Sequence, residues 1–237
     1  ITAQMIAINV GAIAPVFAVV GVFMHMFASK KKTKTIGTLL TGFGVLFMGL
    51  SMMSDAMEPL QKSKAFLHLM TTLSNPILAI GFAAAFTALI QSPGAAIGIL
   101  QTLAMKGLIP FSTAAFMVCG LNIGTCITAV LASMSGDRRP KRIAAFHVLF
   151  NCIGTLIFVG IIAFTPILSI VQSFSVNAAS QIPNFHTIFN LGTTFLLLPF
   201  DKMLLKAIYK IIPERSEEAA ASYVSEKLPR TSASFIE

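Results

Sequence analysis

The sequence predicts an all-α membrane protein built as an inverted repeat, with a re-entrant helical hairpin and a broken transmembrane helix. Hydrophobic residues make up 55% of the chain and charged residues 11%, against about 45–50% and 25% in soluble domains. The charges gather in short loops between apolar segments of membrane-spanning length. Two of those segments are interrupted by polar residues and glycine. The net charge of +8 therefore reflects membrane topology and does not indicate nucleic-acid binding.

The first two membrane spans are expected over about 6–28 and 36–53. The lysine-rich loop SKKKTK joins them at 29–34. Because positively charged loops remain in the cytoplasm, this loop is placed inside. Residues 54–75 carry no net charge and are expected to form an outer loop.

The third apolar segment, 76–105, is interrupted by QSPG at 91–94. Pro93 removes a backbone donor and blocks the preceding turn, while Gly94 tolerates unusual backbone angles. The simpler alternative is a kinked helix whose buried Gln91 bonds to a neighbour. We expect a hairpin, because of the charged loop that follows the next apolar segment.

The fourth apolar segment, 111–134, is interrupted by CGLNIGT at 119–125 and is followed by the basic loop GDRRPKR at 136–142. If both interrupted segments crossed the membrane, this basic loop would lie outside. A hairpin that enters and returns over about 76–105 keeps it inside. We therefore predict a re-entrant hairpin at 76–105 and a broken helix at 111–134.

The last two spans are expected from 143 to about 170, running outward, and from 185 to 200, running inward. The loop between them, 172–183, carries no charge. Lysines follow the final span, which places the C-terminus in the cytoplasm.

Short internal echoes suggest a duplicated chain. FHTIFN at 185–190 resembles FHVLFN at 146–151, and ITA at 1–3 matches ITA at 127–129, directly after the second interruption. The two copies would run in opposite directions, which is the inverted-repeat design of secondary transporters. The expected domains are the end of a first repeat over 1–60, a second repeat over 61–212, and a cytoplasmic tail over 213–237.

The two interruptions are the candidate functional site. Irregular backbone at membrane depth survives only inside protein or beside a water-filled cavity, where helix N-termini attract anions and C-terminal carbonyls suit small cations. The expected substrate- and ion-binding residues are Gln91, Ser92, Gly94, Asn122, Gly124, Thr125 and Thr128, with Thr87, Cys126, Asn151 and Asn190 as secondary candidates.

Several of these residues have a structural alternative. Small residues near Asn122 and Gly124 could serve helix packing alone, and Asn151 and Asn190 suit hydrogen bonds between helices. The three cysteines lie in apolar segments and are expected to be packing residues rather than disulfides or metal ligands. The sequence carries no phosphate-binding loop, catalytic triad or zinc spacing, so we expect neither an enzyme nor an organic cofactor.

The stretches TALIQSPGAAIGILQTLAMKGLIP, CGLNIGTCITAVLAS and RRPKRIAAFHVLFNCIG resemble the second repeat of the sodium-dependent phosphate cotransporter family, the bacterial relatives of the type II sodium–phosphate cotransporters. The resemblance extends over most of residues 1–200. It implies symport of inorganic phosphate with sodium, the coupling ion, by alternating access across the bacterial cytoplasmic (inner) membrane. It also implies that Gln91, Ser92, Asn122 and Thr125 line the phosphate and sodium sites.

The chain departs from this family at two places. Ser92-Pro93-Gly94 stands where the family has three serines, and Cys126 stands where it has a second threonine. A same-architecture transporter of another anion, a phosphate exporter, and a non-transporting scaffold or sensor are therefore alternatives. The tail at 213–237 resembles the lead-in to a PhoU-like helical domain, which would make it a contact for a regulatory domain or partner, and a homo-oligomer is left open.

Overall fold

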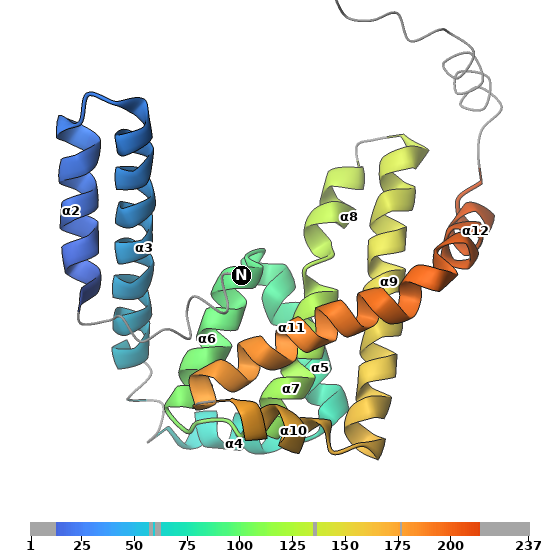
Figure 1. The fold of residues 1–237 in the computed structure, drawn as a ribbon. Coiled ribbons are helices and arrows are strands. Elements are labelled where there is room, and N and C mark those ends of the chain that lie inside the picture. Colours follow the sequence, from blue (N-terminus) through green and yellow to red (C-terminus); the bar gives the residue numbers. More distant parts are fainter. Residues whose placement is uncertain (1–12, 57–58, 60–62, 135–136, 176, 214–237) are drawn as a thin grey trace, which may run out of the picture.

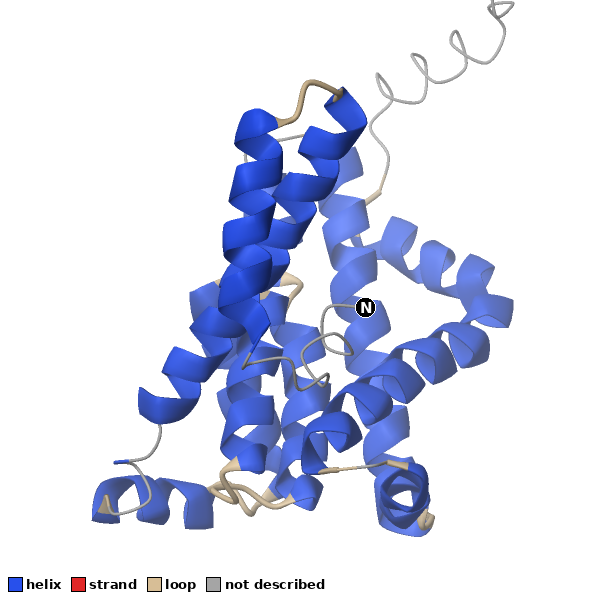
Figure 2. Ribbon diagram, turned by 60° about the vertical axis from the view of Figure 1, so that its left-hand side comes forward, coloured by secondary structure: helices blue, strands red, loops and turns tan. Residues whose placement is uncertain are grey.

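The computed structural model describes residues 13–56, 59, 63–134, 137–175 and 177–213. Throughout these residues the chain is helical, without a strand (Figure 2). The echo expected at 1–3 and nearly all of the expected tail at 213–237 lie outside the described residues.

The helices follow one another in a simple order. They are α2 (Ala14–Phe27), α3 (Lys31–Ala56), α4 (Lys64–Thr72), α5 (Pro76–Ile90), α6 (Pro93–Met105), α7 (Phe111–Gly124), α8 (Ile127–Met134), α9 (Arg138–Phe164), α10 (Ile167–Phe174), α11 (Ala178–Leu197), the 3-10 turn η3 (Leu198–Phe200) and α12 (Asp201–Ile211). Figure 1 shows an antiparallel α2–α3 pair beside a bundle of α5–α9 and α11, with α4 and α10 across one end.

Four helical segments in the described part of the chain are long and apolar enough to cross a bilayer: 31–53, 111–134, 138–164 and 180–211. Large apolar side chains cover the outside of the helices, and Phe164 and Leu89 are 90% and 83% exposed. An outer surface of this kind requires hydrocarbon rather than water around it. The chain is an all-α membrane protein.

α7 is the central helix of the bundle. Its buried residues point in every direction, from Ala114 and Ala115 to Val118 and Leu121, which is the pattern of a helix enclosed on all sides. α5, α6, α9 and α11 surround it. Phe158 of α9 joins this core to α11 by packing against Phe189, with ring centroids 4.9 Å apart.

The α2–α3 pair is held by small residues rather than by large apolar ones. A Cβ atom at Gly37 would lie 2.7 Å from the carbonyl oxygen of Gly21, and one at Gly44 would overlap the backbone of Ala18. Small residues let membrane helices approach until their backbones touch. The lysine-rich loop between these helices is shorter than expected, because α3 already begins at Lys31.

Several expected boundaries are corrected. The span expected at 143–170 ends at Phe164, since Pro166 follows and disfavours helix in the residue before it. α10 and the first turns of α11 occupy the uncharged loop expected at 172–183, where Asn177 and Ser180 form a capping box. The outer loop expected at 54–75 contains α4.

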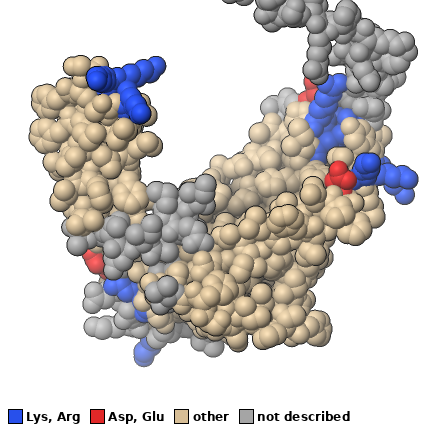
Figure 3. Space-filling view, viewed as in Figure 1, with Lys and Arg blue, Asp and Glu red and all other residues tan. Residues whose placement is uncertain are grey.

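The basic residues mark one end of the molecule. In Figure 3, Lys and Arg gather over the α2–α3 turn and over the neighbouring ends of α9 and α12, with a smaller group near α4 at the opposite end. The loops at 29–34 and 136–142, which the sequence places in the cytoplasm, begin helices that extend from this common end. The arrangement therefore satisfies the charge rule for both loops together.

This arrangement predicts the sidedness of three engineered cysteines. In a background with the three native cysteines replaced by alanine, Lys32→Cys and Lys141→Cys should react with a membrane-impermeant maleimide only after cells are permeabilised, whereas Lys64→Cys should react in intact cells. Labelling of Lys32→Cys and Lys141→Cys from opposite sides would contradict the fold, and a full inversion of the pattern would contradict only the orientation.

Candidate functional site

The first interruption is a two-residue turn between α5 and α6. Gln91 adopts a left-handed backbone conformation (φ 56°, ψ 18°), and its N–H donates to the carbonyl of Thr87 at 2.8 Å. Among the described non-glycine residues, only Gln91 has a positive φ. A residue with a Cβ atom pays about 1–2 kcal/mol for this conformation. The turn therefore holds an exposed glutamine where glycine would be more stable.

Ser92 begins the second helix of the hairpin. Its Oγ accepts from the Ala95 N–H at 3.3 Å, and Pro93 occupies the first helical position, where a missing N–H costs nothing. The expectation that Pro93 interrupts a helix from within, with Gly94 taking up the unusual backbone, is wrong. Pro93 and Gly94 lie inside the first turn of α6, and Gln91 carries the unusual angle.

The hairpin is too short for either helix to cross a bilayer. α5 has 15 residues and α6 has 13, which correspond to about 22 Å and 20 Å against a hydrocarbon thickness of about 30 Å. Figure 1 shows the outer ends of both helices near the end of the molecule where α4 lies, and the turn between them partway along the height of the molecule. Gln91 and Ser92, which form this turn, are exposed.

The second interruption is milder than the sequence suggests. α7 continues through Asn122 to Gly124, and only Thr125 and Cys126 separate it from α8. The Thr125 N–H donates to Leu121 at 3.0 Å and the Cys126 N–H to Ile123 at 3.1 Å, so one turn is tightened without being unwound. The break expected across 119–125 is reduced to these two residues.

The polar side chains at this turn donate to their own helix. Asn122 Nδ2 donates to the Val118 carbonyl at 2.8 Å, Thr125 Oγ1 to Asn122 at 2.7 Å, and Thr128 Oγ1 to Thr125 at 3.1 Å. On the neighbouring helix, Thr87 Oγ1 donates to Ala83 at 2.8 Å. A hydroxyl that has donated its proton keeps lone pairs as acceptors. These threonines therefore present oxygen rather than hydrogen to any further partner.

Two glycines bring the interruptions together. A Cβ atom at Gly120 would overlap the carbonyl of Ile80, and one at Gly124 would overlap the carbonyl of Ala84 and lie 2.7 Å from Thr87 Cβ. The G-x-x-x-G spacing thus forms a backbone contact between α7 and α5. The structure shows a packing role for Gly124. Because Gln91 follows Thr87 by one turn, the contact places both interruptions at the same level (Figure 1).

A third helix reaches the second interruption through Asn151 of α9. Its Nδ2 donates to the His147 carbonyl at 3.0 Å and approaches Cys126 Sγ at 3.5 Å. Asn190 behaves differently, because it is exposed and donates to His186 within α11 at 2.8 Å. Of the two secondary asparagines, Asn151 lies at the candidate site.

Sequence reasoning missed Thr155 as a neighbour of this site. Its buried Oγ1 donates to the Cys119 carbonyl at 3.2 Å, which ties α9 to α7 just before the tightened turn. The sequence could have indicated Thr155 by its spacing from Asn151, because residues four apart lie on the same face of a helix. Together these two residues form the polar stripe that α9 turns toward α7.

The candidate site is polar but contains no charge. The carboxylates of the described residues, Asp55, Asp137 and Asp201, lie at or near helix ends away from both interruptions. In the described part of the chain, no three His, Cys, Asp or Glu side chains form a metal-binding group. Any ion at the two interruptions would therefore be held by neutral oxygens, amides and helix ends.

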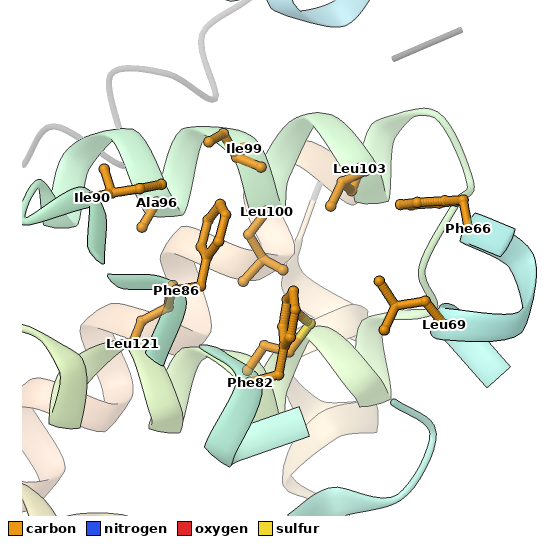
Figure 4. A pocket seen from close by; sticks show the side chains of 11 residues that line it. Phe66, Leu69, Phe82, Phe86, Ile90, Ala96, Ile99, Leu100, Leu103 and Leu121 are labelled. Carbon is orange, nitrogen blue, oxygen red and sulfur yellow. The ribbon is translucent and has the colours of Figure 1, made fainter. Parts of the chain in front are cut away.

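A cavity of about 390 Å³ lies beside the site but does not belong to it. In Figure 4, Phe82 and Phe86 of α5 face Leu100 and Leu103 of α6 across this space. The other lining residues are apolar as well: Phe66, Leu69, Ile90, Ala96, Ile99, Met117 and Leu121. A hydrated ion would lose its hydration in this cavity without replacement, so the cavity does not suit an ion.

The family model described as the Na+/Pi-cotransporter matches residues 1–55 and 49–196. The chain belongs to the Na+/Pi-cotransporter family. This confirms the resemblance found in the sequence. The family is one of transporters, which agrees with the expectation that the chain is not an enzyme. No solved structure matches the chain.

Relatives include bacterial and mammalian proteins. The chain is 31% identical to "Uncharacterized protein YqeW" of Bacillus subtilis over 90% of its own length and 69% of the relative's. It is 25% identical to "Putative inorganic phosphate export protein YjbB" of Escherichia coli over 91% of its own length and 39% of the relative's. It is 27% identical to "Sodium-dependent phosphate transport protein 2A" of the rat over 57% of its own length and 23% of the relative's.

The backbone contact predicts different effects for two glycine substitutions. Gly120→Ala should destabilise the protein by about 1–3 kcal/mol, because the new methyl group overlaps the Ile80 carbonyl. Gly81→Ala is the matched control, since a Cβ atom there meets nothing within 4 Å; it should leave stability unchanged or raise it by up to about 1 kcal/mol. Thermal unfolding in detergent measures both, and equal melting temperatures would rule out the contact.

Proposed function

We infer that this chain forms part of a symporter that moves inorganic phosphate with sodium, by alternating access, across the bacterial cytoplasmic membrane, with its C-terminus in the cytoplasm. The observation that carries the proposal is the pairing of the two interruptions. Gln91 is held in a strained conformation next to the tightened turn of α7, in a member of the Na+/Pi-cotransporter family. Backbone strain of this kind persists where surrounding structure enforces it, often at functional sites.

The hairpin of α5 and α6 is proposed to be re-entrant, entering and leaving from the end that carries α4. Its two helices, each too short to cross a bilayer, support this topology. So does the charge rule, because both basic loops then share one side of the membrane. The family model matches two stretches of the chain in succession, which supports the proposed inverted repeat.

Phosphate is proposed to bind at the hairpin tip. The start of α6 faces the tip and carries the positive end of the helix dipole. Ser92 already accepts from the N–H groups of Ala95 and Ala96. The N–H of Gly94 is therefore the backbone donor proposed for phosphate. The Gln91 side chain adds an amide donor, and no carboxylate of the described residues is present to repel an anion. Ser92 contributes its hydroxyl to the same turn.

Sodium is proposed to bind beside the tightened turn of α7. The hydroxyls of Thr125 and Thr128 already donate to backbone carbonyls, so their remaining lone pairs suit a cation. The Asn122 side chain also donates through Nδ2, which leaves its carbonyl oxygen as the acceptor. Carbonyl groups at the end of a half-helix complete such a site in secondary transporters.

Phosphate export is the second candidate. A relative is named as a putative phosphate exporter, and this chain has Pro93 and Gly94 where the resembled family carries two hydroxyls. Fewer hydroxyls at the tip would remove hydrogen-bond donors for phosphate and change how its binding is coupled to a sodium gradient. Direction and coupling are therefore the quantities to measure.

Transport by the full-length protein in liposomes separates the two candidates. With labelled phosphate outside, an inward sodium gradient should accelerate uptake relative to an equal potassium gradient. Phosphate loss from preloaded liposomes that ignores sodium would favour export. Absence of phosphate movement in both directions, from protein that unfolds cooperatively, would contradict both candidates and favour another substrate or a scaffold.

Substitutions at Gln91 separate its backbone role from its side-chain role. Gln91→Gly should stabilise the protein by about 1 kcal/mol, because glycine accepts the left-handed conformation, yet phosphate uptake should be lost with the amide. Gln91→Asn retains an amide and tolerates this backbone, so it should keep part of the uptake. Full uptake by Gln91→Gly would show that only the backbone of this turn matters.

A further inference from the structure

A second groove lies between α9 and α12, at the basic end of the molecule and away from both interruptions. Its volume is about 300 Å³. The lining residues are Arg139, Arg142, Ile143, Phe146, Leu205, Ile208 and Tyr209. The groove thus has a cationic part, formed where α9 begins, and an apolar part that continues along both helices.

In the cationic part of the groove, contacts with α12 hold the Arg142 side chain in place. Arg142 is only 6% exposed, its Nε donates to the Ile212 carbonyl at 2.9 Å, and its guanidinium lies 4.6 Å from the centre of the Tyr209 ring. These contacts fix its position while its charge remains. Arg139 lines the same groove from an exposed position three residues earlier on α9.

The described residues that line this groove include Arg139 and Arg142 and no carboxylate. Asp137 precedes α9 and Asp201 begins α12, so basic residues outnumber acidic ones at this end of the two helices. α12 adds Lys202, Lys206 and Lys210 on its exposed side. Figure 3 shows the resulting concentration of positive charge at this end of α9 and α12. Such a surface attracts a negatively charged group.

The apolar part of the groove excludes a small inorganic anion as the full explanation. Ile143 is 69% exposed, Leu205 44% and Tyr209 46%, directly beside the arginines. Ile143 also begins the apolar run of α9, so the groove lies where a membrane span meets its charged flank. A ligand that fits both parts must carry an anionic head and a hydrocarbon chain.

We propose that the α9–α12 groove binds an anionic phospholipid, with the phosphate head group at Arg139 and Arg142 and the acyl chains along Ile143, Phe146 and Leu205. Basic pockets between membrane helices bind anionic lipid head groups in this way. Tyr209 suits the boundary, because its ring is apolar and its hydroxyl is polar. A free phosphate ion would use only the arginines.

Native mass spectrometry of the full-length protein in detergent tests the proposal. Phosphatidylglycerol and phosphatidylcholine with identical acyl chains are the probes, so that only the head group differs. Phosphatidylglycerol should bind more tightly, and Arg139→Gln should weaken it by about fivefold, the effect of one cationic residue near an anionic lipid. Lys32→Gln removes an equal charge in the α2–α3 turn and should leave binding unchanged.

A second variant separates a lipid from a simple anion. Ile143→Trp keeps every charge and places a larger side chain at the exposed edge of the groove, so it should weaken phosphatidylglycerol as well. Equal binding of both lipids, or equal losses in Arg139→Gln and Lys32→Gln, would overturn the proposal. Full displacement of the lipid by millimolar inorganic phosphate would also overturn it, in favour of an anion site.

Discussion

Gly120 and Gly124 let α7 approach α5 until the two backbones touch, and the placement of both helix interruptions follows from that contact. In a bilayer, apolar side chains gain little by leaving lipid for protein, so close packing and hydrogen bonds hold helices together. The contact joins the stretch of α5 from Ile80 to Thr87 to the last turns of α7. Both helices end there, and their ends share one depth.

A polar site at that depth must satisfy its own hydrogen bonds. The threonines and Asn122 meet this requirement locally, by donating to carbonyls three or four residues earlier. The result is stable without a ligand and without charge. It also orients the remaining acceptors, because each donor hydrogen is already committed to the helix. If ions bind at such a neutral site, as proposed, no buried charge is left unpaired when the ion leaves.

The sequence predicted the features that depend on local chemistry. The polar stretch at 91–94 separates two apolar helices, and the basic loops mark one end of the molecule. Gly124 was predicted as a site residue, with helix packing through small residues as the alternative, and the structure shows the packing contact. Most of the framework could therefore be predicted without coordinates.

The features that escaped prediction depend on tertiary contacts. A glutamine rarely adopts a left-handed conformation, so sequence reasoning assigned the special backbone to Gly94, whereas the structure places it at Gln91, the residue that ends α5. Whether Asn122 points to a ligand or to Val118 depends on its rotamer, which no spacing reveals. The short helices α4 and α10 were missed because their 9 and 8 residues are too few to span a membrane, and they lie in or beside segments expected to be loops.

Arg138 and Arg142 of α9 also have a mechanical consequence. Arg138 donates to the Pro213 carbonyl at 2.6 Å and Arg142 to the Ile212 carbonyl at 2.9 Å, so the end of α12 is fastened at two points to a membrane-spanning helix. A force that acts on the chain after Pro213 is therefore transmitted to α9 through these two hydrogen bonds. α9 also contacts the central helix region through Asn151 and Thr155. A displacement of α12 at the membrane surface would therefore be transmitted through α9 to the candidate site.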